Sequence, residues 1–293
     1  MYICNDCPRK CNIKREALTI EGKGFCHMGE SPVVARAALH HWEEPPISGT
    51  NGSGTIFFTG CNLQCSFCQN NLISRGKHGK VITINKLKEL YQMLIDKGAH
   101  NINLVTGTHF INAIAQSLDE PLSVPVVYNC GGYEDISALR QLENKVQIYL
   151  PDLKYSDNEL AKKYSNAPNY FEIATDAILE MFRQVGSYEI DENGIMKKGV
   201  IIRHLILPGC TENSKGVIDW VKDTFKPGDV LFSLMSQYTP VDNIKTDELH
   251  RRLTQDEYNE IEDYLIDSGI EDGFLQELSS ASEDYIPDFN LDF

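Results

Sequence analysis

The feature that most constrains this chain is a loop with three cysteines in eight residues, Cys61, Cys65 and Cys68. A loop this short can bring three thiolates to one corner of an inorganic cluster. Four protein ligands usually close a structural zinc site or an iron–sulfur site. Three protein ligands leave one metal ion with an open position, which is typical of a site that binds a further molecule. The spacing therefore predicts a reactive metal centre rather than a structural one.

The loop closely resembles the cluster loop of the radical S-adenosylmethionine (SAM) superfamily. Four further residues resemble the version of this loop found in activases of glycyl radical enzymes: Gly60, Asn62, Phe67 and Asn70. The resemblance implies that the three cysteines hold a 4Fe-4S cluster and that SAM chelates its fourth iron. Two alternatives are a three-cysteine zinc site completed by a histidine and a chance cluster of buried thiols. Free cysteines are rarely packed so densely, which disfavours the second alternative.

Length and composition predict a soluble, cytoplasmic protein with either one large domain or one domain with appendages. The chain has 293 residues, of which 42% are hydrophobic and 24% charged, values that are ordinary for globular domains. No apolar run approaches the ~20 residues that cross a bilayer, and the first residues lack the regions of a signal peptide. Nine cysteines in a cytoplasmic protein indicate metal or redox chemistry rather than a disulfide framework.

The net charge of the chain disfavours two classes of partner. There are 42 acidic residues against 27 Lys and Arg, which makes the formal charge −15. Nucleic-acid binding needs a basic surface that replaces phosphate counterions, and an anionic membrane surface attracts basic segments. We therefore expect neither nucleic acid nor membrane as a partner.

A second cysteine group lies in an N-terminal lobe, which we place at residues 1–53. Its members are Cys4, Cys7, Cys11 and Cys26. Four thiols within 23 residues suit a tetrahedral zinc site or a second iron–sulfur cluster, although the spacing is not that of ferredoxins. The lobe has little apolar content, so a metal would supply folding energy. The alternatives are reduced structural thiols or a redox-labile pair at Cys4 and Cys7.

The main domain, residues 54–240, alternates apolar strand patterns with helical ones. We expect strands at residues 55–59, 102–106, 124–128, 146–150, 200–207 and 230–235, with helices between them. Such units make a parallel α/β sheet, and six are too few to close an eight-stranded barrel. A (β/α)6 partial TIM barrel is also what the family resemblance implies. The cysteine loop follows the first strand and so lies at the C-terminal mouth, where α/β barrels carry their chemistry.

Other strand ends are then expected to bind SAM. Thr106 and Thr108 follow the second strand, where the family has a Gly-Gly-Glu motif that contacts the SAM amino group. Thr108 stands where the glutamate would be, so this contact departs from the family pattern. Asn129 follows the third strand and, by resemblance, takes the position that binds the ribose hydroxyls. Phe67, just before the last cysteine, is also expected beside the cofactor.

Two cations complete the predicted SAM site. Lys154 belongs to a segment that resembles the Asp-Leu-Lys of the activases, and its charge suits the SAM carboxylate. Arg203 lies within an otherwise apolar strand and needs a partner there. That partner is either the SAM carboxylate or Asp152.

The C-terminal extension, residues 241–293, is predicted to contain a helix at residues 254–268 with Thr254 as its N-cap. An acidic tail follows and carries four apolar residues: Tyr285, Ile286, Phe289 and Phe293. A partly ordered, solvated tail is the default expectation. The alternatives are that the tail packs back on the barrel rim or docks a partner.

Nearly the whole chain resembles the pyruvate-formate-lyase-activating-enzyme-like branch that has an N-terminal cysteine lobe. The resemblance implies a radical SAM oxidoreductase: an electron from a flavodoxin or ferredoxin type of donor cleaves SAM to methionine and a 5′-deoxyadenosyl radical. That radical abstracts hydrogen, either from the glycine of a glycyl radical enzyme or from another protein side chain or small metabolite. The rival hypothesis is a non-catalytic metal-binding or interaction protein on the same scaffold, and Thr108 is the best argument for it.

Overall fold

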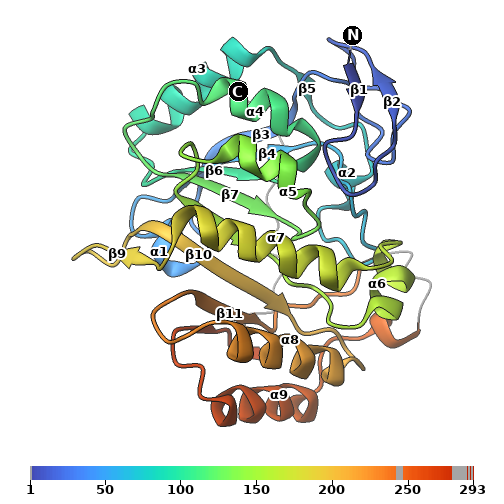
Figure 1. Ribbon diagram of the computed structural model, residues 1–293, viewed down its shortest axis with the longest axis vertical. Helices are drawn as coiled ribbons and strands as arrows, with labels where there is room; N and C mark the ends of the chain where they lie inside the picture. The colour runs from blue at the N-terminus through green and yellow to red at the C-terminus, as the bar shows by residue number, and fades with distance from the viewer. Residues whose placement is uncertain (1, 242–246, 279–288, 290, 292) are drawn as a thin grey trace.

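A mostly parallel sheet forms the centre of the protein (Figure 1). The computed structural model describes residues 2–241, 247–278, 289, 291 and 293. The parallel strands are β4 (Ser53–Phe58), β6 (Ile102–Val105), β7 (Val126–Cys130), β8 (Ile148–Pro151), β10 (Met196–Leu205) and β11 (Leu231–Met235). Each pairs in parallel with the next one along the chain. The predicted partial barrel is therefore confirmed.

Further strands extend this sheet at both ends. β3 (Val33–His40) runs antiparallel to β4, and the short β5 (Lys80–Val81) pairs with β3. At the other end β12 (Gly273–Leu275) lies parallel to β11, and β9 (Glu189–Ile190) pairs with β10. The sequence pattern places residues 33–40 with the N-terminal lobe, whereas the structure pairs them with the first strand of the barrel.

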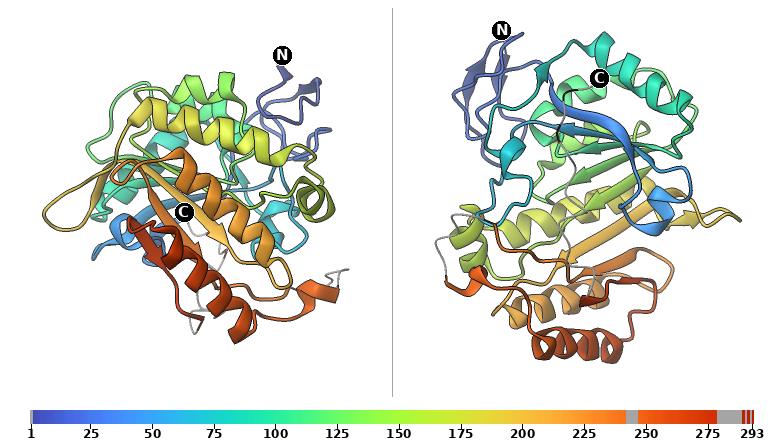
Figure 2. Two further views of the ribbon diagram at one scale, coloured as in Figure 1. Left: turned by 60° about the horizontal axis from the view of Figure 1, so that its bottom comes forward. Right: turned by 180° about the vertical axis from the view of Figure 1, so that it is seen from behind.

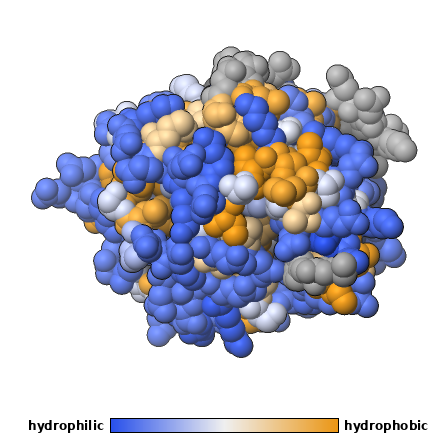
Figure 3. All heavy atoms as spheres, turned by 90° about the horizontal axis from the view of Figure 1, so that it is seen from above, coloured by the Kyte–Doolittle hydropathy of each residue, from blue (hydrophilic) through white to orange (hydrophobic). Residues whose placement is uncertain are grey.

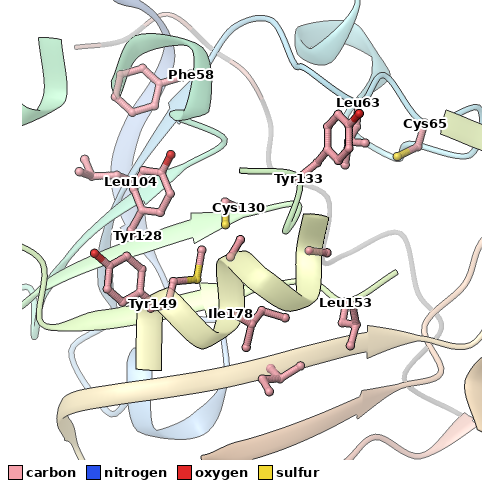
Figure 4. Packing of buried hydrophobic residues seen from close by; sticks show 14 of the residues in the cluster. Phe58, Leu63, Cys65, Leu104, Tyr128, Cys130, Tyr133, Tyr149, Leu153 and Ile178 are labelled. Atoms are coloured by element: carbon pink, nitrogen blue, oxygen red, sulfur yellow. The ribbon is translucent and has the colours of Figure 1, made fainter. Parts of the chain in front are cut away.

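Helices cover the outer face of the sheet (Figures 1 and 2). They include α3 (Ile84–Asp96), α4 (Ile111–Ser117), α5 (Ile136–Leu139), α6 (Asn158–Ser165), α7 (Tyr170–Val185) and α8 (Thr211–Thr224). In α3, Leu87, Leu90 and Leu94 recur at helical spacing and are buried. The Thr83 hydroxyl accepts a hydrogen bond from the Lys86 amide and so caps the start of the helix. Figure 4 shows Ile178 of α7 in the layer that holds Tyr128 and Tyr149 of the strands.

The inner face of the barrel has an apolar lower layer and a polar upper layer. The lower layer contains Val127, Leu150, Ile201 and Leu231, packed against Ile47 of the short helix α1 (Pro45–Ser48). Side chains alternate between the two faces of a strand, so the residues two positions further along also face inward. Those residues are Asn129, Asp152, Arg203 and Ser233. The apolar layer thus closes the bottom of the barrel, and the polar layer lines the cavity at its mouth.

The N-terminal lobe forms a small sheet of its own, with β1 (Tyr2–Cys4) antiparallel to β2 (Ile13–Arg15). It lies beside the cysteine loop and the short helix α2 (Asn71–Ser74), at one end of the main sheet (Figure 2). Figure 3 looks onto this end of the molecule, where hydrophobic residues gather within a largely hydrophilic surface. The two strands of the lobe are therefore not part of the main sheet.

The C-terminal extension contains α9 (Gln255–Ser268) with Thr254 as its N-cap, as predicted, and Glu257 completes a capping box with Thr254. Of the apolar tail residues, Tyr285 and Ile286 lie outside the described residues. Phe289 is buried, and its ring contacts Phe57 of β4 with centroids 5.6 Å apart. None of the helices in the described ranges is both long and apolar enough to span a membrane.

Candidate SAM and cluster site

A cavity opens where the parallel strands end, and most of the predicted site residues line it. They are Cys61, Cys65, Phe67, Cys68, Thr106, Asn129, Lys154 and Arg203. These residues come from the ends of β4, β6, β7, β8 and β10, which the parallel topology brings to one edge of the sheet. Thr108 is the exception, because it is not among the lining residues.

The cysteine loop turns sharply as soon as β4 ends. Gly60 has a φ of +87°, and a Cβ atom there would lie 2.4 Å from Met28 Cγ and 3.0 Å from the Cys26 carbonyl oxygen. Only glycine permits both this backbone conformation and this approach to the N-terminal lobe. The backbone turn and the packing against the lobe therefore require glycine at position 60, whether or not a ligand is bound.

The thiols of the loop are held by hydrogen bonds from the protein. The Leu63 amide donates to Cys61 Sγ at 3.3 Å, and the Ser165 hydroxyl donates to Cys65 Sγ at 3.0 Å. Burial raises the pKa of Cys61 to about 12 and also raises the pKa of Cys68. Metal binding must therefore supply the free energy that deprotonates these thiols.

The donor set fits an iron–sulfur cluster. Three sulfurs from one loop face a wall that is apolar at Leu63 and Phe67, and the charge of Lys154 lies near Cys65. Phe67 is buried, and the centroid of its ring lies no more than 6.5 Å from the ring centroids of Tyr155, Tyr164 and Tyr238. In the described part of the chain, no group of three His, Cys, Asp or Glu side chains is already placed to hold a metal ion.

A compact ionic network forms the polar layer of the cavity. Arg203 donates to Asp152 at 2.9 Å, to Glu43 at 3.0 Å and to Asn129 at 2.8 Å. Lys154 donates to the second oxygen of Asp152 at 2.6 Å. Each of the three guanidinium nitrogens makes one of these bonds, whereas the ammonium makes one bond and keeps two N–H groups for a ligand.

The charges of this network hold one another ionised. Burial opposes ionisation of Asp152, but the charges of Arg203 and Lys154 outweigh it and lower its pKa. Burial likewise opposes the charge on Lys154, yet the Asp152 carboxylate raises its pKa. The ion pairs of the layer therefore form a chain, in which Lys154 pairs with Asp152, Asp152 with Arg203, and Arg203 with Glu43. Of the two possible partners predicted for Arg203, the structure shows Asp152.

The second strand end differs from the family pattern in its geometry as well as its sequence. Thr106 lines the cavity with a φ of +59°, a strained conformation for a β-branched residue, and its amide donates to the Asn129 carbonyl at 2.8 Å. Thr108 is buried, and its hydroxyl donates to Glu134 at 2.5 Å. The structure thus directs the Thr108 side chain to an internal carboxylate rather than to the cavity.

Two acidic residues of this region were missed by the sequence analysis. Glu43 lines the cavity and binds Arg203 and Asn129, although it precedes the barrel in the chain. Glu134 is buried outside the cavity, and burial raises its pKa to about 8. Glu43 lies two positions before Pro45, where α1 begins, and Glu134 lies four positions after the end of β7, so neither has a local signal for its role.

The structure couples Cys7 electrostatically to Cys4 and Cys26, and three of the four N-terminal thiols make hydrogen bonds within the lobe itself. Cys4 Sγ donates to Asp6 at 3.6 Å, Cys11 Sγ accepts from the Phe25 amide at 3.4 Å, and Cys26 Sγ accepts from Arg15 at 2.9 Å. Cys4, Cys7 and Cys26 are buried. Burial raises the pKa of Cys7 to about 12. A metal at these four thiols remains a proposal.

Comparisons with known proteins identify the family. A family model described as the radical SAM superfamily matches residues 55–221. The uncharacterised protein MJ0674 of Methanocaldococcus jannaschii is 30% identical over 278 residues, which cover 89% of this chain and 73% of that one.

Solved structures agree in fold. The crystal structure of Streptococcus suis SuiB aligns with a TM-score of 0.51 at 14% identity, covering 79% of this chain and 50% of SuiB. SuiB bound to its precursor peptide SuiA aligns with a TM-score of 0.51 at 12% identity, covering 75% of this chain and 48% of SuiB. This chain therefore spans about half of SuiB, and at such low identity the likeness concerns the fold.

Proposed function

The chain belongs to the radical SAM superfamily, and on that premise we propose that it cleaves SAM reductively and passes the radical to a substrate. Family membership implies a 4Fe-4S cluster and SAM as cofactors. The observation that carries the proposal is that three cysteines and the Lys154–Asp152 pair line one cavity. When bound, the cluster supplies the electron that splits SAM into methionine and a 5′-deoxyadenosyl radical.

The residues of the cavity would orient SAM. Lys154 has N–H groups to spare, so it would bind the SAM carboxylate by a charge-assisted hydrogen bond. Arg203 already donates to three partners and would instead hold Asp152, Glu43 and Asn129 in place.

Two neighbouring side chains would bind the ribose. Glu43 and Asn129 lie 3.2 Å apart, and together they offer acceptors and a donor to its hydroxyls. Phe67 and Leu63 would keep water from the reacting sulfur. Orientation and exclusion of water are the contributions that a protein makes to cofactor chemistry.

The substrate is proposed from the resemblance of the cysteine loop to that of the activases. It would be a backbone glycine of a glycyl radical enzyme, and the electron donor would be of the flavodoxin or ferredoxin type. The alternative substrates are another protein side chain or a small metabolite, since a fold does not fix a substrate.

Anaerobic reconstitution with iron and sulfide, followed by dithionite and SAM, tests the proposal. We expect 5′-deoxyadenosine and methionine from the native chain, and a loss of at least about 1000-fold in the Cys65→Ala variant, because an incomplete ligand set cannot hold the cluster. An intact cluster that forms no 5′-deoxyadenosine would favour the rival hypothesis of a non-catalytic protein on this scaffold. Unchanged product in the variant would contradict the cluster assignment.

A further inference from the structure

One arginine of the N-terminal lobe connects three separate parts of the structure. Arg9 Nε donates to the Asn62 carbonyl at 2.7 Å, and its Nη2 donates to the Ser165 carbonyl at 2.9 Å. Its remaining nitrogen, Nη1, donates to the Asn166 carbonyl. The first acceptor belongs to the cysteine loop and the other two to the end of α6. A single guanidinium therefore ties the loop to a helix that lies more than 90 residues later in the sequence.

Aromatic rings hold the guanidinium in this position. The carbon centre of Arg9 lies 3.8 Å from the centroid of the Phe25 ring and 5.2 Å from that of Tyr133. Stacking on an aromatic face and a fork of directed donors are properties of arginine that lysine does not share. The backbone of Phe25 adds a second tie, since its carbonyl accepts from Gln64 of the cysteine loop at 2.7 Å.

A residue that Arg9 contacts is itself in contact with a cysteine of the loop. Ser165, whose carbonyl Arg9 binds, donates its hydroxyl to Cys65 Sγ at 3.0 Å. Ser66, which follows Cys65 in the loop, donates its amide to the Tyr164 carbonyl of α6 at 2.7 Å. Arg9 thus fixes the distance between the loop and the groups of α6 that orient Cys65. It touches no part of the cavity itself.

We propose that the N-terminal lobe is a brace for the cluster loop and that Arg9 is its positioning residue. This inference rests on the proposed function, because it concerns the cluster that the loop would hold. Groups that orient metal ligands from outside typically change metal affinity by about 10–100-fold when removed. Loss of Arg9 would therefore make the cluster labile and change how SAM sits beside it, without altering any residue that lines the cavity.

The test compares Arg9→Ala with Arg9→Lys and with Lys10→Ala in the full chain. Lys10 is the neighbouring cation, and it binds the Asn5 carbonyl and Asp135 rather than the cysteine loop. After anaerobic reconstitution we expect Arg9→Ala to lose cluster iron to a chelator about 10–100-fold faster than the native chain. Arg9→Lys should lie between the two, and Lys10→Ala should match the native chain.

A spectroscopic measurement separates positioning from a general loss of stability. The electron paramagnetic resonance signal of the reduced cluster should shift on adding SAM in the native chain and in Lys10→Ala, and less so in Arg9→Ala. If Arg9→Ala does not fold, Phe25→Ala takes its place, because it keeps the donors of Arg9 and removes only the stacked ring. Its SAM-induced shift should be smaller than that of the native chain. Equal chelation rates and equal spectra in Arg9→Ala and Lys10→Ala would overturn the proposal. A native chain that takes up no cluster would instead contradict the proposed function.

Discussion

The two cysteine groups of this chain place the same side chain in different surroundings. Cys61, Cys65 and Cys68 follow a central strand and border a cavity that contains two cations and two carboxylates. In the N-terminal group Cys4 ends the strand β1, and the sulfurs of Cys4, Cys26 and Cys11 contact the lobe's own Asp6, Arg15 and Phe25 amide. The loop cysteines thus have space and charge beside them for a second molecule, which a reactive site needs, whereas a closed structural site needs only its four ligands.

The largest effect is expected from metal analysis of a Cys61→Ala/Cys65→Ala/Cys68→Ala variant, which tests whether the N-terminal cysteines hold a metal of their own. If the N-terminal group is a closed site, this variant should retain about one zinc or about four irons per chain, because four thiolates suffice for either. Inductively coupled plasma mass spectrometry and absorption spectra after reconstitution measure this. The matched control replaces the four N-terminal cysteines by Ser and should lose that metal. Neither zinc nor iron in the triple variant would contradict a second metal site.

A smaller effect is expected from Lys154→Ala, which removes one cation from the cavity. A hydrogen bond to a charged group contributes about 1.5–3 kcal/mol, so the KM for SAM should rise about 10–100-fold. The rate of 5′-deoxyadenosine formation against SAM concentration measures this. Lys163→Ala is the control, because Lys163 pairs with Glu248 on the surface. If Lys154→Ala left the KM unchanged, the carboxylate would have to bind elsewhere.

The smallest effect concerns Glu134, a buried carboxyl whose charge would raise the pKa of both Cys7 and Cys130. Burial raises its own pKa to about 8, above the value of an unfolded chain. Between these two pKa values the folded state binds one proton more at Glu134 than the unfolded state does. The contribution of this proton to the free energy of unfolding is complete below the unfolded pKa and is lost as the pH rises through about 8.

Thr108 and Tyr128 donate to different oxygens of Glu134, and Glu134→Gln keeps an acceptor for only one of them, but it cannot ionise. The unfolding midpoint of the native chain should therefore fall by several degrees relative to this variant between pH 5.5 and pH 8.5, which corresponds to a few kcal/mol. Differential scanning fluorimetry at both pH values checks the difference. Parallel curves for the two proteins would show that Glu134 does not titrate in this range.

Much of the fold could be predicted because its signals are local. Each parallel strand is a short apolar run, and the cysteine loop follows the first of them directly, so the mouth of the barrel is predictable. The capping box at Thr254 is equally local. Arg203 required a partner because an unpaired cation inside an apolar strand is costly, and Asp152 lies beside it across the β8–β10 bridge.

The remaining features depend on long-range contacts that no local pattern contains. Glu43 binds Asn129, 86 positions away, and Arg203, 160 positions away. β3 joins the barrel through its pairing with β4, although the Gly- and Ser-rich segment between them resembles a domain boundary. Thr108 bonds Glu134 because both side chains are buried together, and burial cannot be read from the residues that follow a strand.

The brace formed by Arg9 also has a consequence for how the protein is made. Arg9 and the three loop cysteines leave the ribosome early, but Ser165 and Asn166 follow Arg9 by 156 and 157 positions. At ~5–20 residues per second, synthesis of that interval takes roughly 8–30 s. During this time both cysteine groups are available to metals and oxidants before the loop is locked. Cluster insertion during translation would therefore meet an open loop, and insertion afterwards would meet a closed one.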